Sequence, residues 1–253
     1  MVRTILTCLA LAFCCAGCTQ KPATESKVAD KKLSKDSAIQ ATSAEQAPSP
    51  IQNNCKSQTS LVFEDAGLSS FTEDNIRGAG VISFRLNTND RLDILNLDGS
   101  VFGGIVVNED GNYFTLTMPQ KTTARNLIPN QDFEAFDFDA EPVAADPDYL
   151  LIYVNKEKRK VKKDGIRYTF HTWTQYLLGN TIHLRPCNLL KDAKGSEIKN
   201  SIEQIFEITA VHGDWITIKS INDCQSDGPY QNIQGRLKWR ANGALLIDFT
   251  SCE

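Results

Sequence analysis

Short runs of β-prone residues, separated by turn residues, constrain this chain more than any other feature of its sequence. The runs are Val81–Leu86, Arg91–Leu95, Gly104–Val107 and Tyr113–Thr117. Asp98-Gly99 and Asp110-Gly111 lie between them, and an Asp-Gly pair between apolar runs is typical of a β-hairpin turn. No long segment of helical period separates the runs, which argues against β-α-β units. The sequence therefore predicts a mainly β protein with two small β-barrel or β-sandwich-like domains.

Residues 120–148 lose this pattern and are rich in Asp and Glu. The alternation of Phe133, Phe136 and Phe138 with acidic residues is compatible with an edge strand whose acids face water. A calcium site is the alternative, because Ca²⁺ prefers clustered carboxylates, but the D-x-D-x-D-G loop is missing. We therefore favour a solvated acidic connector and expect no metal and no cofactor. The connector divides an N-terminal β domain, residues 55–145, from a C-terminal domain, residues 146–253.

The next segment predicts a hairpin and one helix. Tyr149–Val154 is a strongly apolar strand candidate, and the Lys-rich segment Asn155–Asp164 follows it. These lysines form either a basic patch for anionic lipid or glycan, or a hairpin whose charges prevent pairing with other chains; the hairpin is favoured. Thr172 and Gln175 have the spacing of a capping box, and Gly179 suits a left-handed helix end. One short helix is therefore predicted near residues 173–178.

The N-terminus has the layout of a secretory signal. Arg3 precedes an apolar stretch, Ile5 to Cys15, and the small pair Ala16-Gly17 stands immediately before Cys18. The apolar stretch is too short to span a bilayer as a finished helix. This arrangement resembles the lipobox of bacterial lipoproteins, with Cys15 at the position where that family usually has Leu. The resemblance implies that residues 1–17 are removed, that the Cys18 thiol and the new amine are acylated, and that the lipid holds the protein on a membrane.

Residues 19–54, together with the lipidated Cys18, are predicted to form a disordered tether. They contain almost no aromatic or large apolar residues, so they cannot bury enough surface to offset chain entropy. Such a chain would hold the folded part roughly 30–35 Å from the membrane. Thr19 follows the cysteine where an Asp would retain an enterobacterial lipoprotein in the inner membrane, and no acidic cluster follows. By resemblance, we expect an outer-membrane protein of the bacterial cell envelope that faces the periplasm.

Four cysteines remain beyond the anchor: Cys55, Cys187, Cys224 and Cys252. An even number in an exported chain indicates two disulfides, with three possible connectivities. Asn242-Gly243 predicts a hairpin in which Leu245–Phe249 runs back along Gly235–Arg240. That hairpin would bring Cys252 close to Cys224, so this pairing is favoured, with Cys55 bonded to Cys187.

The last part of the chain resembles a bacterial SH3-like (SH3b) domain over residues 181–250. Its strands and turns carry the matching residues Leu184, Arg185, Gly213, Trp215, Ile218, Gly235, Leu237 and Trp239. Two differences are Arg236, where that family usually has an aromatic residue, and the long loop 221–234. The resemblance implies a small barrel with a ligand groove, and the candidate ligand-binding residues are Trp215, Trp239, Arg185 and His212. Both tryptophans are expected to be chiefly core residues.

Catalytic chemistry is not indicated by this sequence. Of the three histidines, which include His171, neither His183 nor His212 has a carboxylate or cysteine at a spacing typical of a relay. Every mature cysteine is better used in a disulfide. The formal net charge of −4 argues against a nucleic-acid partner. The expected function is a non-catalytic, lipid-anchored binding module for an extended envelope ligand, either a peptidoglycan peptide or a protein segment. The alternatives are a scaffold or inhibitor-like lipoprotein and, third, a cell-wall glycan hydrolase.

Overall fold

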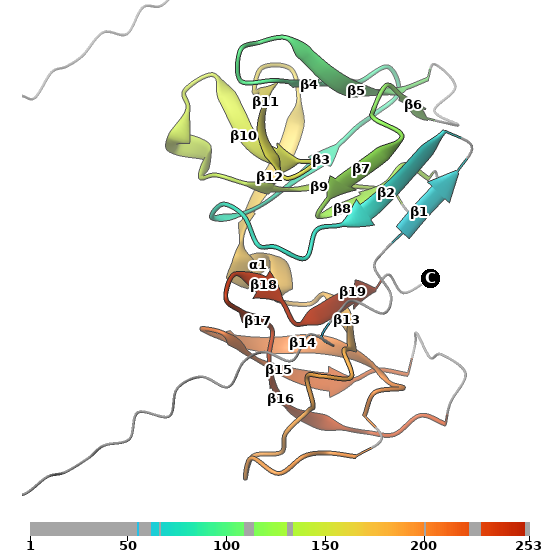
Figure 1. The fold of residues 1–253 in the computed structure, drawn as a ribbon, viewed down its shortest axis with the longest axis vertical. Coiled ribbons are helices and arrows are strands. Elements are labelled where there is room, and N and C mark those ends of the chain that lie inside the picture. Colours follow the sequence, from blue (N-terminus) through green and yellow to red (C-terminus); the bar gives the residue numbers. More distant parts are fainter. Residues whose placement is uncertain are drawn as a thin grey trace, which may run out of the picture. The chain divides into compact units, whose positions relative to one another are not determined.

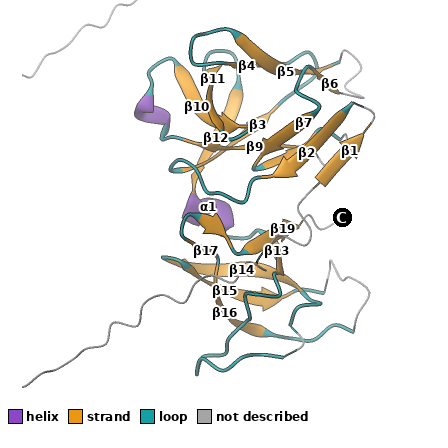
Figure 2. Ribbon diagram, in the orientation of Figure 1, coloured by secondary structure: helices purple, strands orange, loops and turns teal. Residues whose placement is uncertain are grey.

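The computed structural model describes Cys55 and residues 62–65, 67–108, 114–130, 134–199, 201–222 and 229–250 (Figure 1). These residues belong to one compact unit. The signal segment, Cys18 and the tether lie outside the described residues, as do Cys224, Cys252 and the Asp110-Gly111 turn. Strands account for most of the described chain, with one short α-helix, which confirms the predicted fold class (Figure 2).

The first half of the fold is a large antiparallel sheet of nine strands with a smaller sheet beside it. The path through the large sheet is β12-β3-β9-β10-β11-β4-β5-β6, and β8 pairs with β9. Its strands are β3 (Gly80–Arg85), β4 (Arg91–Leu95), β5 (Val101–Val107), β6 (Phe114–Leu116), β8 (Asn126–Ile128), β9 (Ala135–Ala140), β10 (Tyr149–Val154), β11 (Glu157–Lys162) and β12 (Arg167–Thr172). The smaller sheet contains β1 (Val62–Asp65), β2 (Leu68–Thr72) and β7 (Lys121–Ala124), and its β2 and β7 run parallel.

The second half is a five-stranded antiparallel sheet with the order β16-β15-β14-β13-β19. Its strands are β13 (Thr181–Leu184), β14 (Ile205–His212), β15 (Trp215–Ser220), β16 (Gln234–Lys238) and β19 (Ile247–Thr250). A separate hairpin contains β17 (Arg240–Ala241) and β18 (Ala244–Leu245), and a 3-10 turn, η1, spans Val143–Ala145. Strand pairing among the described residues closes no barrel. Of the two arrangements that the sequence predicted, barrel or sandwich, the open sheets therefore fit the sandwich-like one.

Local sequence explains the turns and the helix. Helix α1 (Trp173–Leu177) begins at the predicted capping box, in which Thr172 and Gln175 satisfy each other's backbone N–H groups. The β10–β11 turn places Asn155 and Lys156 at φ values of 52° and 69°. Asn242 and Gly243 have φ values of 51° and 75°. Two successive positive φ values match the right-handed twist of the strands that a two-residue turn joins.

The acidic segment forms strands, which corrects the prediction of a solvated connector. Strand β9 lies inside the large sheet, between β3 and β10, and is not an edge strand. Phe136 and Phe138 are buried in the core, and Asp139 is also buried. The acids do not all face water, because the side of β9 that carries Asp139 is covered by other parts of the protein.

Strand pairing also crosses the domain boundary predicted at residue 145. Beyond that residue, β10 pairs with β9, β11 pairs with β4, and β12 pairs with β3. The first apolar core consists of buried side chains between Ile82 and Val161. The second core begins with Trp173 and includes Val81 from the first sheet. The change from one core to the other therefore falls at the start of α1.

The Asn242-Gly243 turn is present, but the strand after it takes a different partner from the one predicted. The turn joins only β17 to β18. Strand β19 then pairs with β13, so that Phe249 lies opposite Ile182. Leu245 pairs with Arg240, and the Leu246 amide donates to the carbonyl of Trp239 at 2.9 Å, but the chain beyond these two residues does not run along Gly235–Arg240. The predicted reason for pairing Cys224 with Cys252 is therefore lost. The physical cause is burial, since β19 places apolar side chains in the second core.

A fully buried arginine, Arg125, lies between the two cores. It donates to both carboxylate oxygens of Asp139, at 2.8 and 2.9 Å, and to the carbonyls of Glu73 at 2.6 Å and Asn75 at 3.1 Å. Its guanidinium carbon lies 5.0 Å from the ring centroid of Trp173. Burial lowers the pKa of Arg125, but the attraction of Asp139 raises it and prevails, so the guanidinium stays charged.

Replacing Arg125 should be costly. In Arg125→Ala the Asp139 carboxylate stays buried without its partner, so we expect a loss of about 3–5 kcal/mol in the free energy of unfolding, measured with urea. The control is Arg91→Ala, which removes an exposed ion pair with Asp93 and should cost less than about 1 kcal/mol. Equal losses in the two variants would contradict the stabilising role of the buried Arg125–Asp139 ion pair.

Candidate functional site

The outer face of the five-stranded sheet places a half-buried tryptophan among cationic side chains. His212 pairs with Trp215, and Trp215 pairs with Lys238, so the three lie in one row across β14, β15 and β16. Arg236 lies two residues before Lys238 and therefore on the same face. His212, Arg236 and Lys238 are exposed, whereas the alternate residues of β15 and β16 fill the second core.

A surface hollow of about 260 Å³ lies against this tryptophan. Its lining consists of Lys191, Asp192, Ala193, Gly195, Trp215 and Arg236. Lys191 and Arg236 exchange both backbone hydrogen bonds, at 2.9 and 2.8 Å, which holds the loop against β16. Asp192 Oδ1 accepts hydrogen bonds from the amides of Lys194 and Ser196, both at 2.8 Å, so this carboxylate is used within the loop.

The charges around Trp215 favour an anionic ligand with an apolar surface. The Arg236 guanidinium lies 5.9 Å from the ring centroid of Trp215, and Lys238 Nζ lies 5.6 Å from it. Such cations are attracted to the face of the indole, and they keep N–H donors for a carboxylate. We term His212, Trp215, Arg236, Lys238 and Lys191 the Trp215 face. The sequence analysis named Trp215 and His212 as candidates but not Arg236 and Lys238, which alternate along a strand. Its expectation that Trp215 is chiefly a core residue is wrong, because the ring is half-buried on the outer face of the sheet.

Trp239 belongs to the core, as predicted. It is 2% exposed, and its indole Nε1 donates to the carbonyl of Gly213 at 2.8 Å. Its ring centroid lies 5.9 Å from that of Trp173. Because Trp239 follows Lys238 at the end of β16, its side chain points to the opposite face from the Trp215 face. Trp239 therefore supports the sheet from inside and is not available to a ligand.

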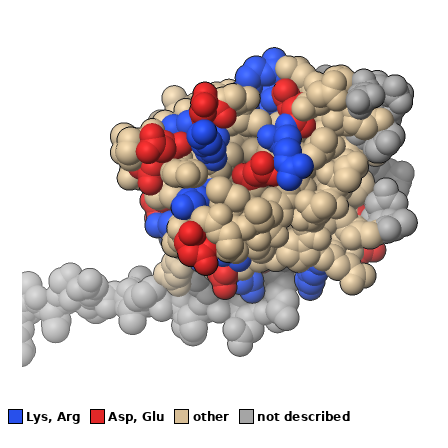
Figure 3. Space-filling view, turned by 90° about the horizontal axis from the view of Figure 1, so that it is seen from above, with Lys and Arg blue, Asp and Glu red and all other residues tan. Residues whose placement is uncertain are grey.

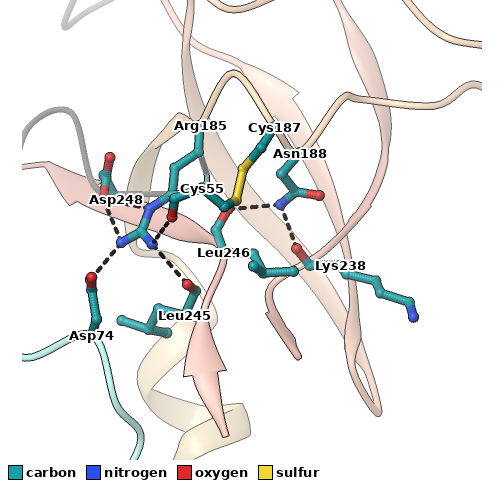
Figure 4. Close-up of a disulfide and its surroundings, with 9 residues drawn as sticks. All are labelled: Cys55, Asp74, Arg185, Cys187, Asn188, Lys238, Leu245, Leu246 and Asp248. Carbon is teal, nitrogen blue, oxygen red and sulfur yellow. Dashed lines mark hydrogen bonds and ion pairs between the residues drawn. A yellow bond between two sulfur atoms is a disulfide. The ribbon is translucent and has the colours of Figure 1, made fainter. Parts of the chain in front are cut away.

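Arg185 is likewise a structural residue (Figure 4). Its side chain is 3% exposed, and its five N–H groups face two carboxylates and two carbonyls. Nε and Nη2 contact Asp248 at 2.9 and 2.8 Å, and Nη2 contacts Asp74 at 2.7 Å. Nη1 donates to the carbonyls of Leu245 at 2.8 Å and Cys55 at 3.3 Å. No donor of Arg185 is left for a ligand, so the structure removes it from the candidate set.

The cysteines that the structure describes are bonded to each other. Cys55 and Cys187 form a disulfide with their Cα atoms 5.2 Å apart, which agrees with the expected pairing of these two residues. Next to it, the Asn188 side-chain amide donates to the carbonyls of Lys238 at 2.7 Å and Leu246 at 2.8 Å (Figure 4). The disulfide thus ties the start of the folded chain to the segment that supports β16.

The Lys-rich hairpin forms as predicted, with β11 following β10. Its charges are balanced by nearby acids, since Lys158 contacts Glu141 at 2.8 Å and Arg159 contacts Glu157 at 2.7 Å. Basic and acidic side chains lie interspersed on the face seen from above (Figure 3). Strand β11 also lies within the sheet rather than at its edge, so its lysines do not protect an edge. The hairpin is therefore a mixed-charge surface and not a uniform basic patch.

One histidine is paired with an acidic residue across two neighbouring strands. His183 lies opposite Asp248 in the β13–β19 pair, an arrangement that the sequence did not predict. Burial lowers the pKa of His183, and the attraction of Asp248 opposes this shift. That carboxylate is already held by Arg185. Within the described ranges, no group of three or more His, Cys, Asp or Glu side chains is arranged to hold a metal ion.

Comparisons with known proteins identify no relative: no protein-family model, curated protein or solved structure matches this chain. In the part of the chain that the structure describes, no helix is both long and apolar enough to cross a membrane.

The two tryptophans should respond differently to removal. Trp239→Ala should lower the free energy of unfolding by about 3–5 kcal/mol, because it leaves a cavity in the core. Trp215→Ala should cost about 1 kcal/mol or less, because the ring is on the outer face. Urea unfolding followed by circular dichroism measures both. A loss at Trp215 as large as that at Trp239 would show that Trp215 is a core residue instead.

Proposed function

We propose that this chain is a lipid-anchored, non-catalytic binding module of the bacterial cell envelope. It recognises an extended ligand that carries carboxylates, and the Trp215 face is its binding surface. The observation that carries this proposal is the row of His212, Trp215 and Lys238 with Arg236 beside it, over a hollow of about 260 Å³. An aromatic ring flanked by cations suits a ligand that alternates apolar and anionic groups.

Cell-wall peptides have that chemistry, and we favour them over a protein segment. They are extended, they present small apolar side chains, and they carry free carboxylates. An indole contributes apolar contact area at a small cost in conformational entropy. Arginine and lysine supply charge-assisted hydrogen bonds to the carboxylates.

We also propose that residues 181–250 form an SH3-like domain. Strands β13 to β16 pair in chain order, and the last strand, β19, returns to pair with the first. The residues that carry the resemblance occupy consistent places: Gly213 has a φ value of 61° in the β14–β15 turn, and Leu237 is buried in the second core. Arg236, which replaces the usual aromatic residue, lines the hollow beside Trp215. A cation at that position would favour acidic ligands over neutral ones.

The proposed function also includes a lipid anchor at Cys18. The order Ala16-Gly17-Cys18 after an apolar stretch supports lipidation at Cys18, and the polar segment that follows supports a tether. Two or more acyl chains give stable membrane attachment where a single chain does not. The proposed location is the periplasmic side of the outer membrane, from which the tethered module could reach the cell wall.

Binding to purified sacculi tests the Trp215 face. The wild-type protein should sediment with sacculi, and Trp215→Ala and the double variant Arg236→Glu/Lys238→Glu should each reduce the bound fraction about tenfold. The matched control is Arg91→Glu/Lys162→Glu, which reverses two exposed charges on the other sheet and should bind normally. Capture of an envelope protein without binding to sacculi would favour the scaffold or inhibitor-like alternative. Cleavage of the sacculi would favour the hydrolase.

The anchor has a separate test. Cys18→Ser should leave the protein with an uncleaved signal or release it from the membrane, because the thiol that receives the lipid is gone. Mass spectrometry and detergent phase partitioning of cells with and without globomycin measure the change. An unchanged mature mass and unchanged partitioning in treated cells would contradict lipidation.

A further inference from the structure

A second hollow, of about 490 Å³, lies on the outer surface of the large sheet and has no part in the proposed function. Its polar lining comes from β3, β9, β12 and the segments next to them, and consists of Ser83, Arg85, Asn87, Glu134, Asp137 and Arg167. The volume lies within the range of roughly 300–1,000 Å³ that is usual for small-molecule sites. We term it the sheet cavity.

Strand alternation explains why this surface is polar. Ile82 and Phe84 of β3 and Phe136 and Phe138 of β9 point into the first core. The residues between them must therefore point to the other side. Ser83 pairs with Asp137, so these two polar side chains lie next to each other at the floor of the cavity.

Asp137 at the floor already accepts hydrogen bonds from hydroxyl groups. The Tyr176 hydroxyl donates to Asp137 Oδ2 at 2.9 Å, and the Ser83 hydroxyl also bonds this carboxyl group. Burial raises the pKa of Asp137, although both hydrogen bonds and the charges of His171 and Arg125 oppose the shift. Tyr176 comes from α1, so the helix closes one end of this polar strip. The floor is thus suited to hydroxyl donors.

Two arginines stand above this floor and face each other across neighbouring strands. Arg85 of β3 lies directly opposite Arg167 of β12, and both are exposed. Like charges in this position destabilise a sheet. Arg167 has a distant partner in Asp90, at 3.8 Å. Among the residues that the structure describes, Arg85 makes no ion pair. Among the described residues, neither arginine forms an ion pair with Glu134 or Asp137 of the same cavity, so an anion between the two guanidinium groups would stabilise them.

We propose that the sheet cavity binds a sugar that carries a carboxylate. The carboxylate lies between Arg85 and Arg167, which are suited to paired N–H···O contacts with it. The sugar hydroxyls donate to Asp137 and Glu134 and exchange hydrogen bonds with Ser83 and Asn87. A ligand with a second anionic group is disfavoured by the two carboxyl side chains. A purely apolar ligand would leave these polar groups without partners.

The test compares two sugars that differ only in the carboxylate. Nuclear magnetic resonance titration of the purified full-length protein with glucuronate should show saturable binding, with shifts that include the amides of β3 and β12. Glucose should bind at least about tenfold more weakly, because it has no carboxylate to pair with Arg85 and Arg167. Arg85→Gln and Arg167→Gln should each weaken glucuronate binding by a similar factor. Arg91→Gln, an exposed arginine on β4, is the matched control and should leave binding unchanged.

Three results would overturn the proposal. They are the absence of saturable binding of glucuronate, equal binding of glucose, and binding of alanine or inorganic phosphate as tight as that of glucuronate. The first would mean that the cavity holds no such sugar. The second would remove the role of the arginines, and the third would assign the site to a zwitterion or a simple anion. Trp215→Ala serves to separate this site from the proposed function, because it should reduce binding to sacculi and leave glucuronate binding intact.

Discussion

The buried pair of Arg125 and Asp139 is the interaction on which the rest of the structure depends. Asp139 holds the guanidinium from inside the large sheet, and the backbone carbonyls of Glu73 and Asn75 hold it from the segment before β3. The same guanidinium faces Trp173, the first residue of α1. One side chain thus fixes the large sheet, the connecting segment and the helix that opens the second half. A buried charge is tolerated here because each contact partner is well placed.

Arg185, which belongs to the second half of the fold, makes a similar set of contacts. It contacts Asp248 on β19 and Asp74 in the same connecting segment. The hairpin of β17 and β18 adds backbone contacts, since the Ile76 amide donates to Gly243 and the Leu245 amide donates to Asp74. Segment 73–76 is therefore held by two arginines and a hairpin. Both halves of the fold share this segment, which explains why they form one compact unit.

The outer faces of the sheets take no part in holding the two halves together, so they stay open to ligands. The arginines that are buried hold the two halves together, whereas Arg85, Arg167 and Arg236 stand on outer surfaces beside hollows. Of the two tryptophans in the SH3-like resemblance, Trp239 supports the sheet and Trp215 faces out. The proposed sites thus lie on hydrogen-bonded strands with their side chains outside the cores, so substitutions in them should alter binding more than folding.

The sequence by itself determined what depends on neighbours along the chain. The capping box at Thr172, the Asn-Gly turn at residue 242 and the β-prone runs of β3, β4 and β10 all act over a few residues, so each element was predictable. Tertiary structure decided the rest. Asp139 is buried and not exposed to water because Arg125, which is distant in the sequence, pairs with it. Strand β19 pairs with β13 and not with β16 because its apolar residues are buried in the second core. Trp215 and Trp239 lie on opposite faces because a strand alternates its sides, and only the packed sheet shows which side is covered.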